Sequence, residues 1–344
     1  MVTKTFLAER FLTLAQSSGL ATDLQIPGFK TRRLKLKGDV VTSDVKNSRI
    51  AVDLRQPEFF FRIPLKYSFP VNRLKDAWNS SRAISYAINE HPAYIHMAIK
   101  SIETLRAFNQ KIKVQIFYYG RISTKTRSSF ENLNVKIIRR NYVSPRFDLM
   151  MKWISICELQ SEKNVFVDAD TVFIKDPAHL FLSLKKANFL ARIESKTSKK
   201  SADGQINYSL FNAIRKHLNV KARPIFNTGV MVFNRTFVEE LRKNIPFFYW
   251  VQFHFKKSPE LYPSRNTHLA EEISFSLTLG RMKSLKLALI SKKRIPLYEE
   301  LSATSTGEYF LIHFGTHYAE QFYRSFFGES DSRVLRKYLF LGRI

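Results

Sequence analysis

Apolar and polar positions follow a regular pattern only after about residue 80 of this 344-residue chain. From there, apolar runs of strand length alternate with longer stretches in which apolar residues recur every three or four positions, the spacing of one helix face. Strands separated by helices favour an α/β fold with a mostly parallel, open sheet covered on both faces. The expected strands are residues 83–89, 113–119, 135–138, 165–167 and 230–233, and the expected helices are residues 92–108, 147–159 and 237–255, the last one interrupted near Pro246.

The first 80 residues lack this sustained pattern and mix basic and polar segments with a few apolar ones. Two apolar groups, residues 59–61 and 63–65, are expected to dock this region onto a larger body. We therefore expect three parts. They are a basic N-terminal extension at residues 1–80, the α/β domain at residues 81–325 and a basic C-terminal tail at residues 326–344.

A pair of carboxylates ends the expected strand at residues 165–167. Asp168 and Asp170 stand two positions apart, and side chains at this spacing along an extended segment point to the same side. Oxygen ligands suit a hard divalent cation such as Mg²⁺ or Mn²⁺, which commonly bridges to substrate phosphates. Ligands bind beyond the carboxyl ends of strands in open α/β sheets, where this pair is expected to lie. The alternative is an ordinary turn, because Asp is common at strand ends.

A second polar group precedes the strand at residues 230–233. Asn227, Thr228 and Gly229 enter this strand. The amide of Asn227 can donate to and accept from sugar hydroxyls, and Gly229 would allow a close approach of the backbone or a positive φ. The alternative is a polar turn that leads into a core strand.

Two histidines, His313 and His317, follow an apolar run near the C-terminus. A neutral imidazole can complete a Mn²⁺ site with carboxylates. The alternative is a purely structural role, which is more common for a histidine at the end of a strand.

The chain carries 56 Lys and Arg against 29 Asp and Glu, a formal net charge of +27. Such a charge favours polyanionic partners, namely nucleotide phosphates, anionic membrane surfaces, acidic glycans or nucleic acid. A general lysine bias without any polyanionic partner is the alternative. Basic stretches at residues 30–37 and 330–343 would suit contact with an anionic membrane.

One cysteine, Cys157, excludes an intrachain disulfide framework and fits a reducing compartment. It lies in a mostly apolar helical stretch, which favours a buried thiol over a nucleophile. The sequence has no apolar run of membrane-spanning length and no apolar core of a secretory signal. We therefore expect a cytoplasmic protein, peripheral at the inner membrane face where it meets lipid.

These motifs occur in an order that resembles the GT-A glycosyltransferases, most closely glycosyltransferase family 8, the group of glycogenin and the lipopolysaccharide galactosyltransferases. The resemblance covers about residues 82–320. The motifs that carry it are Arg146-Phe147 with Lys152 in a helix, Val-Asp-Ala-Asp-Thr-Val at 167–172, Phe-Asn-Thr-Gly-Val-Met-Val-Phe-Asn at 226–234 and His-Phe-Gly at 313–315. The first 80 residues are not part of it. The resemblance implies a Rossmann-like, mostly parallel sheet and a UDP-sugar-dependent hexosyltransferase.

The resemblance also implies roles for individual residues. Asp168 and Asp170, with Ala169 between them, and His313 would hold Mn²⁺ or Mg²⁺ against the diphosphate of a nucleotide-sugar donor, with a UDP-sugar favoured. Lys152 would lie near the donor phosphate or ribose. The uracil and ribose would contact Tyr86, Ala87, Ile88 and Asn89, and the sugar and acceptor would contact Asn227, Thr228 and Gly229.

Two departures from the family pattern leave alternatives open. The segment that begins at His313 is shortened and lacks the family's lysine, so His313 and His317 are both candidate metal ligands. Glu271 and Glu272 replace the family's usual Asp-Gln-Asp element and are candidate catalytic bases for inversion, or solvated acids that favour a helix start. The family itself favours retention.

The first functional hypothesis is therefore a metal-dependent glycosyltransferase that acts on a glycan, a lipid-linked or another acceptor hydroxyl. The alternative is a non-catalytic protein that binds nucleic acid or anionic membranes through a degenerate sugar-nucleotide domain. Of these two partners, the sequence favours nucleic acid less than an anionic membrane. A nucleotidyltransferase is a third reading, but residues 89–92 do not form the glycine-rich phosphate loop that it would normally require.

Overall fold

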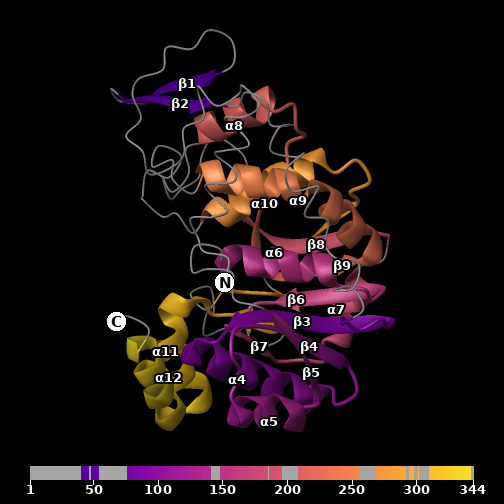
Figure 1. Cartoon of the computed structure of the whole chain (residues 1–344), viewed down its shortest axis with the longest axis vertical. Helices are drawn as coiled ribbons and strands as arrows, with labels where there is room; N and C mark the ends of the chain where they lie inside the picture. Colours follow the sequence, from indigo (N-terminus) through magenta and orange to yellow (C-terminus); the bar gives the residue numbers. More distant parts are fainter. Residues whose placement is uncertain are drawn as a thin grey trace. The chain divides into compact units, whose positions relative to one another are not determined.

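A computed structural model describes residues 40–45, 48–53, 76–140, 148–184, 186–195, 208–255, 269–291, 294–297, 301 and 310–341. The chain divides into two compact units. Figure 1 labels helices and strands of both. Unit 1 comprises Met1–Lys66, Thr197–Arg223 and Pro246–Gly280, and unit 2 comprises Tyr67–Lys196, Pro224–Ile245 and Arg281–Ile344. The expected docking segments 59–61 and 63–65, Arg146-Phe147 and the basic stretch 30–37 lie outside the described residues.

Unit 2 is built on a seven-stranded sheet in the order β10-β8-β9-β6-β3-β4-β5. Only β9 runs antiparallel to its two neighbours, β6 and β8, and the other pairs are parallel. Buried aliphatic and aromatic residues fill the central strands, which is typical of a sheet covered on both faces. The strands are β3 (Arg82–Asn89), β4 (Lys113–Tyr119), β5 (Val135–Arg140), β6 (Lys163–Val167), β8 (Phe189–Ser195), β9 (Ile225–Asn234) and β10 (Leu287–Ile290).

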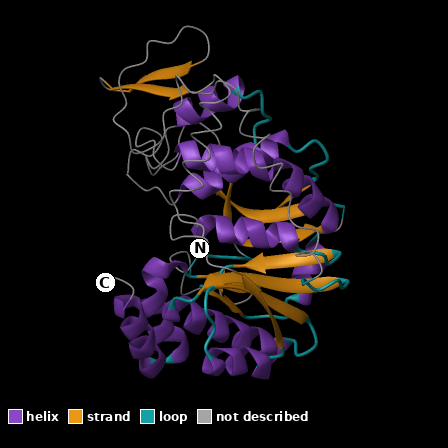
Figure 2. Ribbon diagram, viewed as in Figure 1, coloured by secondary structure: helices purple, strands orange, loops and turns teal. Residues whose placement is uncertain are grey.

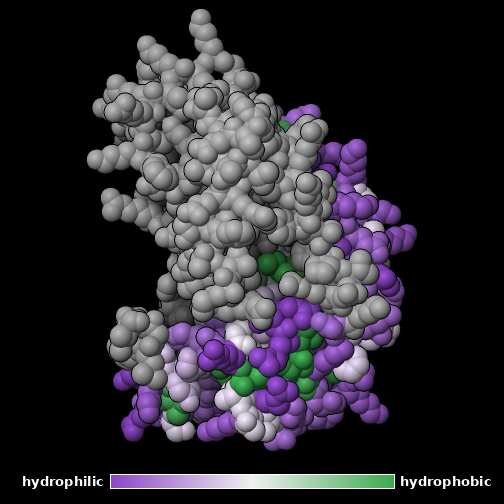
Figure 3. Space-filling view, viewed as in Figure 1, coloured by the Kyte–Doolittle hydropathy of each residue, from purple (hydrophilic) through white to green (hydrophobic). Residues whose placement is uncertain are grey.

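Helices cover both faces of this sheet (Figure 2). Tyr86 of β3 points to one face, where its hydroxyl lies 3.0 Å from Ser101 Oγ of α4 (Pro92–Phe108). Tyr119 of β4 points to the other face and donates to the carbonyl of Met151 in α6 (Asp148–Glu158). Two shorter helices, α5 (Thr124–Asn132) and α7 (Ala178–Ser183), pack on β5 and β6. Hydrophilic residues cover much of the coloured surface in Figure 3, with a hydrophobic area among them.

The predicted α/β architecture is confirmed, since the sheet is open, mostly parallel and flanked by helices. The expected strands at 83–89, 113–119, 135–138 and 165–167 and the helix at 92–108 coincide with observed elements to within about two residues. The strand expected at 230–233 begins earlier, at Ile225, so Asn227, Thr228 and Gly229 lie inside β9 rather than in a turn before it. The expected break near Pro246 is wrong, because α9 (Arg235–Phe255) continues through this proline. Pro246 lies in the middle of that helix, where a missing N–H costs one hydrogen bond.

Two short segments pair outside the main sheet. β7 (Thr171–Phe173) and β11 (Leu311–His313) form an antiparallel pair in which His313 stands opposite Thr171. Beyond β11 the chain forms α11 (Gly315–Phe327) and α12 (Glu329–Leu341). Helix α12 contacts α4, where Lys100 lies 3.2 Å from Asp331. Most of the segment expected as a basic tail is therefore helical.

Unit 1 contains a hairpin of β1 (Val40–Val45) and β2 (Ser48–Asp53), α8 (Tyr208–His217) and most of α10 (Leu269–Arg281). Gly280 packs closely against the segment after α8, because an added Cβ would lie 2.4 Å from the carbonyl oxygen of Lys221. Ser276 also donates to the carbonyl of Arg223, 3.0 Å away. None of the helices that the structure describes is both long and apolar enough to cross a membrane.

The single cysteine lies inside α6 with no exposed surface. Burial raises the pKa of the Cys157 thiol well above its ordinary value, although the charge of Arg242 opposes this shift. We expect the folded chain to react with an aromatic disulfide reagent at about pH 8 at least roughly 100-fold more slowly than free cysteine. The absorbance of the released thiolate measures this. One equivalent should react once the chain is unfolded in guanidinium, whereas rapid reaction of the native chain would contradict a buried, inert thiol.

Candidate metal centre

Asp168 and Asp170 lie at the carboxyl end of β6, where the chain leaves the main sheet and enters β7. The backbone N–H of Asp168 donates to the carbonyl of Gly229 at 2.8 Å, which extends the β6–β9 ladder by one residue. Ala169 between them is buried in the core, so the connection is anchored. The Asp168 side chain is 32% exposed and that of Asp170 is 13% exposed, so the pair lies at the surface of the unit without projecting far from it.

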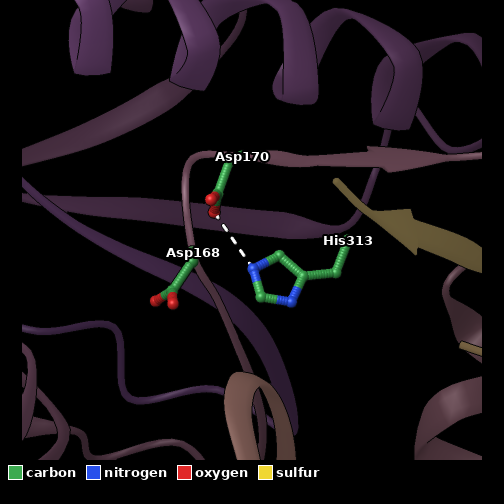
Figure 4. Close-up of side chains that lie close together, drawn as sticks. All are labelled: Asp168, Asp170 and His313. Atoms are coloured by element: carbon green, nitrogen blue, oxygen red, sulfur yellow. Dashed lines mark ion pairs between the residues drawn. The ribbon is translucent and has the colours of Figure 1, made fainter. Parts of the chain in front are cut away.

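His313 reaches this pair because β11 pairs with β7. His313 stands opposite Thr171, the residue after Asp170, and the backbone N–H of Phe314 donates to the Asp170 carbonyl at 3.0 Å. The imidazole Nε2 lies 3.3 Å from Asp170 Oδ1 (Figure 4). One ligand atom from each of Asp168, Asp170 and His313 lies within 4.8 Å of the other two. Two carboxylates and an imidazole from segments about 145 residues apart therefore converge at one end of the sheet.

Gly229 leaves the space that the imidazole occupies. A Cβ at this position would lie 2.3 Å from His313 Cε1 and 2.7 Å from Nε2, closer than atoms can approach. Among the described glycines, the positive φ values belong to Gly120, Gly315 and Gly328. Of the two reasons for glycine that the sequence left open, close approach is thus the one observed, and the approaching group is a protein side chain.

Lys152 of α6 holds Asp168 from the other side. Its Nζ donates to Asp168 Oδ2 at 2.9 Å and to Thr228 Oγ1 at 3.2 Å. The lysine is only 8% exposed, so its ammonium group lies in a setting where charge interactions are stronger than in water. The cluster thus contains two carboxylates, one ammonium and one titratable imidazole.

The imidazole and the Asp170 carboxyl shift each other's pKa. For His313, burial lowers the pKa, but the charge of Asp170 and its hydrogen bond outweigh this, so the pKa lies above its ordinary value. For Asp170, burial raises the pKa, but the charge of His313, its hydrogen bond and the charge of Lys152 together outweigh this and hold the pKa below its ordinary value. Their ion pair therefore stabilises the folded chain between the unfolded pKa values of aspartate and histidine. This contribution is lost as the pH rises through the folded pKa of His313 or falls through the folded pKa of Asp170.

A buried chain of hydroxyl groups supports the connection that carries Asp168 and Asp170. Thr171 Oγ1 donates to the Asp168 carbonyl at 2.9 Å and lies 3.1 Å from Ser101 Oγ, which in turn lies 3.0 Å from the Tyr86 hydroxyl. All three side chains are fully buried. Sequence reasoning missed Thr171 and Ser101 as positioning residues, and a single threonine and serine in apolar stretches give no signal of such a role.

The residues expected around the nucleotide divide into two groups. The side chains of Tyr86 and Ile88 point into the core and are 0% and 4% exposed, so neither is available to a base or ribose. Ala87 and Asn89 are partly exposed, and Asn89 Oδ1 accepts from the backbone of His91. The expected contact of Tyr86 and Ile88 with a nucleotide is therefore limited to their backbone.

The residues expected around the sugar and acceptor lie at the start of β9 and in α10. Asn227 Oδ1 accepts from the backbone N–H of Gly229 at 3.1 Å, which fixes the orientation of its amide group. Glu271 and Glu272 lie in the first turn of α10, in unit 1, so the expectation of a helix start is confirmed. The expectation of two solvated charges is wrong for Glu271, which is buried, and a role as bases stays a prediction. The backbone of His317 belongs to α11, and its side chain lies outside the described part of the structure.

Comparison with known proteins gives a partial match. Residues 81–186, under a third of the chain, match a family model described as "Mannosyltransferase putative". No curated protein matches the sequence.

Several solved structures are similar. The bifunctional glycosyltransferase WbbM has 14% identity and a TM-score of 0.43, and the match covers 69% of this chain and 46% of WbbM. The galactosyltransferase LgtC, in complex with donor and acceptor sugar analogues, has 14% identity and a TM-score of 0.47 over 74% of this chain and 95% of LgtC. The glycosyltransferase GlyE of Streptococcus pneumoniae has 13% identity and a TM-score of 0.48 over 74% and 63%. These likenesses are too distant to assign a function.

Proposed function

We propose that the chain is a metal-dependent glycosyltransferase of the GT-A type that transfers a sugar from a nucleoside-diphosphate sugar to an acceptor hydroxyl. The observation that carries this proposal is the convergence of Asp168, Asp170 and His313 at the carboxyl end of the central strands. The matched family model supports it, because residues 81–186 include both aspartates and the family description names sugar transfer.

The three side chains fit a divalent cation. Their ligand atoms are close enough to share one ion, and Gly229 has no side chain to fill the space around the imidazole. Carboxylates with an imidazole suit Mn²⁺ better than Mg²⁺, which prefers oxygen ligands throughout. When bound, such an ion would act as a Lewis acid that neutralises charge on the leaving diphosphate. His313 must give up its proton to serve as a ligand, so cation binding is expected to release a proton.

The remaining polar groups can serve the donor. Lys152 is held 2.9 Å from Asp168, and a second cationic group beside the cluster would stabilise a diphosphate as its charge develops. A UDP-sugar is the donor favoured by the resemblance to family 8. The description of the matched family adds nucleoside-diphosphate mannose to the candidates.

Lys152 gives a prediction with two opposite effects. Lys152→Met removes a positive charge next to Asp168, so the affinity for Mn²⁺ alone should rise by roughly 3- to 10-fold. The affinity for a nucleoside diphosphate in the presence of Mn²⁺ should fall by roughly 10- to 100-fold, because a charge-assisted contact is lost. Calorimetric titration measures both. Lys125→Met on the exposed surface of α5 is the matched control and should change neither, and a fall in both affinities for Lys152→Met would refute this role.

The proposed transfer can follow one of two stereochemical courses. Retention needs no strong base, since the acceptor attacks from the side of the leaving group. Inversion would need a carboxylate, for which Glu271 and Glu272 are the candidates. Nuclear magnetic resonance of the first product anomer distinguishes these courses. An inverted product whose formation is lost in Glu271→Gln or Glu272→Gln would identify the base, and Asn227→Ala tests the contact to the sugar.

The experiment that tests the function is a panel of UDP- and GDP-sugars incubated with the full chain and Mn²⁺. Release of one nucleoside diphosphate, abolished by chelation, is the expected result. If the chain neither binds nor turns over any nucleotide sugar of the panel, the result would favour the alternative, a non-catalytic protein that binds anionic membranes or nucleic acid. A cytoplasmic location and a glycan or lipid-linked acceptor remain part of the proposal, and fractionation of cells and acceptor screening test them.

A further inference from the structure

Unit 2 carries a row of basic residues at the edge of the sheet opposite the candidate metal centre. Lys163, Arg82 and Lys113 are the first residues of β6, β3 and β4, three neighbouring parallel strands. Arg82 pairs in register with Lys163, and Lys113 pairs with the residue after Arg82. Adjacent strands lie about 4.8 Å apart, so the backbones of these three basic residues lie within about 10 Å along one edge. Paired residues project to the same face, so Arg82 and Lys163 point to one face of the sheet and Lys113 points to the other.

These three charges have no carboxylate partner within the described part of the chain, although other basic residues of the unit do. Lys100, Arg140 and Arg235, for example, each pair with one or two acidic side chains. Arg82 and Lys163 stand directly opposite each other on one face, and like charges in such a pair repel and cost stability unless an opposite charge compensates them. An external anionic surface would supply that compensation.

Large apolar and aromatic side chains accompany the basic row. Trp78 lies beneath two ammonium groups, those of Lys113 and Lys136, each 4.7 Å from its ring centroid. Phe108, at the end of α4 just before the loop into β4, is 46% exposed. Leu182 of α7 is 58% exposed and follows Phe181, whose ring lies 5.9 Å from the Arg82 guanidinium.

The combination of basic and exposed apolar side chains favours a lipid bilayer over nucleic acid as the anionic partner. Basic side chains interspersed with exposed Phe and Leu are typical of surfaces that enter the headgroup region of a bilayer. Single-stranded nucleic acid would instead require aromatic rings that are free to stack on bases. Trp78 is not such a ring, because two ammonium groups lie over it, and Leu182 cannot stack at all, so of these side chains Phe108 alone could stack on a base.

We infer that the edge formed by Arg82, Lys113 and Lys163, with Phe108 and Leu182 beside it, is a docking surface for an anionic phospholipid bilayer. Strand β6 separates this edge from Asp168 by five residues, or about 17 Å. A bilayer at this edge would therefore contact the amino ends of the strands and leave the candidate metal centre, at their carboxyl ends, away from the lipid. The inference does not rest on the proposed function, and membrane binding and sugar transfer are separable.

The test measures how the full chain partitions onto vesicles of phosphatidylcholine with about 30% phosphatidylglycerol, at about 0.1 M salt. The triple variant Arg82→Gln/Lys113→Gln/Lys163→Gln should bind roughly 100-fold more weakly, since each basic residue near an anionic surface contributes about fivefold. The matched control, Lys125→Gln/Arg127→Gln/Arg139→Gln, removes the same charge from exposed positions elsewhere in the unit and should change binding by less than about threefold.

A second variant tests the apolar part. Phe108→Ser/Leu182→Ser keeps every charge and should weaken vesicle binding by roughly 10-fold, since exposed apolar side chains insert between headgroups. Circular dichroism and the melting temperature report on folding for each variant. Asp170→Asn should bind vesicles like the wild type, which separates this inference from the proposed function.

Equal binding by the triple variant and its control would overturn the inference and would point to other basic segments. So would binding to pure phosphatidylcholine that is as strong as binding to the anionic vesicles. Preferential binding to a single-stranded oligonucleotide, lost in the triple variant, would assign the same edge to nucleic acid instead.

Discussion

Asp170→Asn should abolish Mn²⁺-dependent release of nucleotide from the donor, with a loss of roughly 10³-fold or more. The substitution keeps the size of the side chain but removes the charge that would bind the proposed cation and that faces His313 Nε2 at 3.3 Å. A metal that acts as Lewis acid contributes several kcal/mol to such a reaction, which corresponds to this loss. Steady-state release of nucleotide and Mn²⁺ affinity should fall together.

Asp176→Asn is the matched control for this variant. Asp176 lies six residues further along the same segment and accepts from Asn109 Nδ2 and from the backbone N–H of Ala178. Its role is structural, so its loss should lower the melting temperature by a few degrees and leave Mn²⁺ affinity within about twofold. If both variants lost activity equally, loss of local structure rather than loss of a ligand would explain Asp170→Asn.

Gly229→Ala should weaken Mn²⁺ binding by roughly 10- to 100-fold although residue 229 contributes no ligand atom. The added Cβ would lie 2.3 Å from His313 Cε1, so the imidazole must turn away from Asp170. Strand β9 itself has no positive φ at this position to forbid alanine. The fold should therefore survive with a loss of about 1–3 kcal/mol from overpacking. Titration with Mn²⁺ and thermal unfolding measure the two effects.

A double-mutant cycle shows whether Gly229 acts through His313. His313→Ala removes the ring with which the new Cβ collides, so Gly229→Ala should cost little further Mn²⁺ affinity in that background, about 0.5 kcal/mol or less. Additive losses in the double variant would mean that alanine disturbs β9 or Asp168 directly. The cycle therefore separates close packing against the imidazole from a general defect in the strand.

The main sheet could be predicted because each of its parallel strands is a short apolar run bounded by polar residues. Strands β3 and β4 were found almost to the residue, and with them the carboxyl edge at which Asp168 lies. Strands β8 and β10 were not predicted, since their apolar runs are short and lie among basic residues. Hydrophobic periodicity identifies strands but does not reveal which of them pair.

The sequence could predict which three side chains form the candidate metal centre, but not the strand pairing that brings them together. The spacing of Asp168 and Asp170 indicates ligands, and the resemblance adds His313. No local pattern predicts that β11 pairs with β7, which is the contact that brings His313 to Asp170. The interior position of Tyr86 was missed for a related reason, because a strand buried on both faces shows no alternation that would reveal where each side chain points.

The most direct test of the central claim is the binding of UDP and GDP to the full chain, by calorimetry, with and without Mn²⁺. If the candidate metal centre holds the proposed cation, one nucleoside diphosphate should bind at least roughly 10-fold more tightly with Mn²⁺ than without it, and Asp170→Asn should remove this difference. Equal binding in the presence and absence of Mn²⁺, or a dependence on Mn²⁺ that Asp170→Asn leaves intact, would contradict the assignment of Asp168, Asp170 and His313 as the site of a catalytic cation.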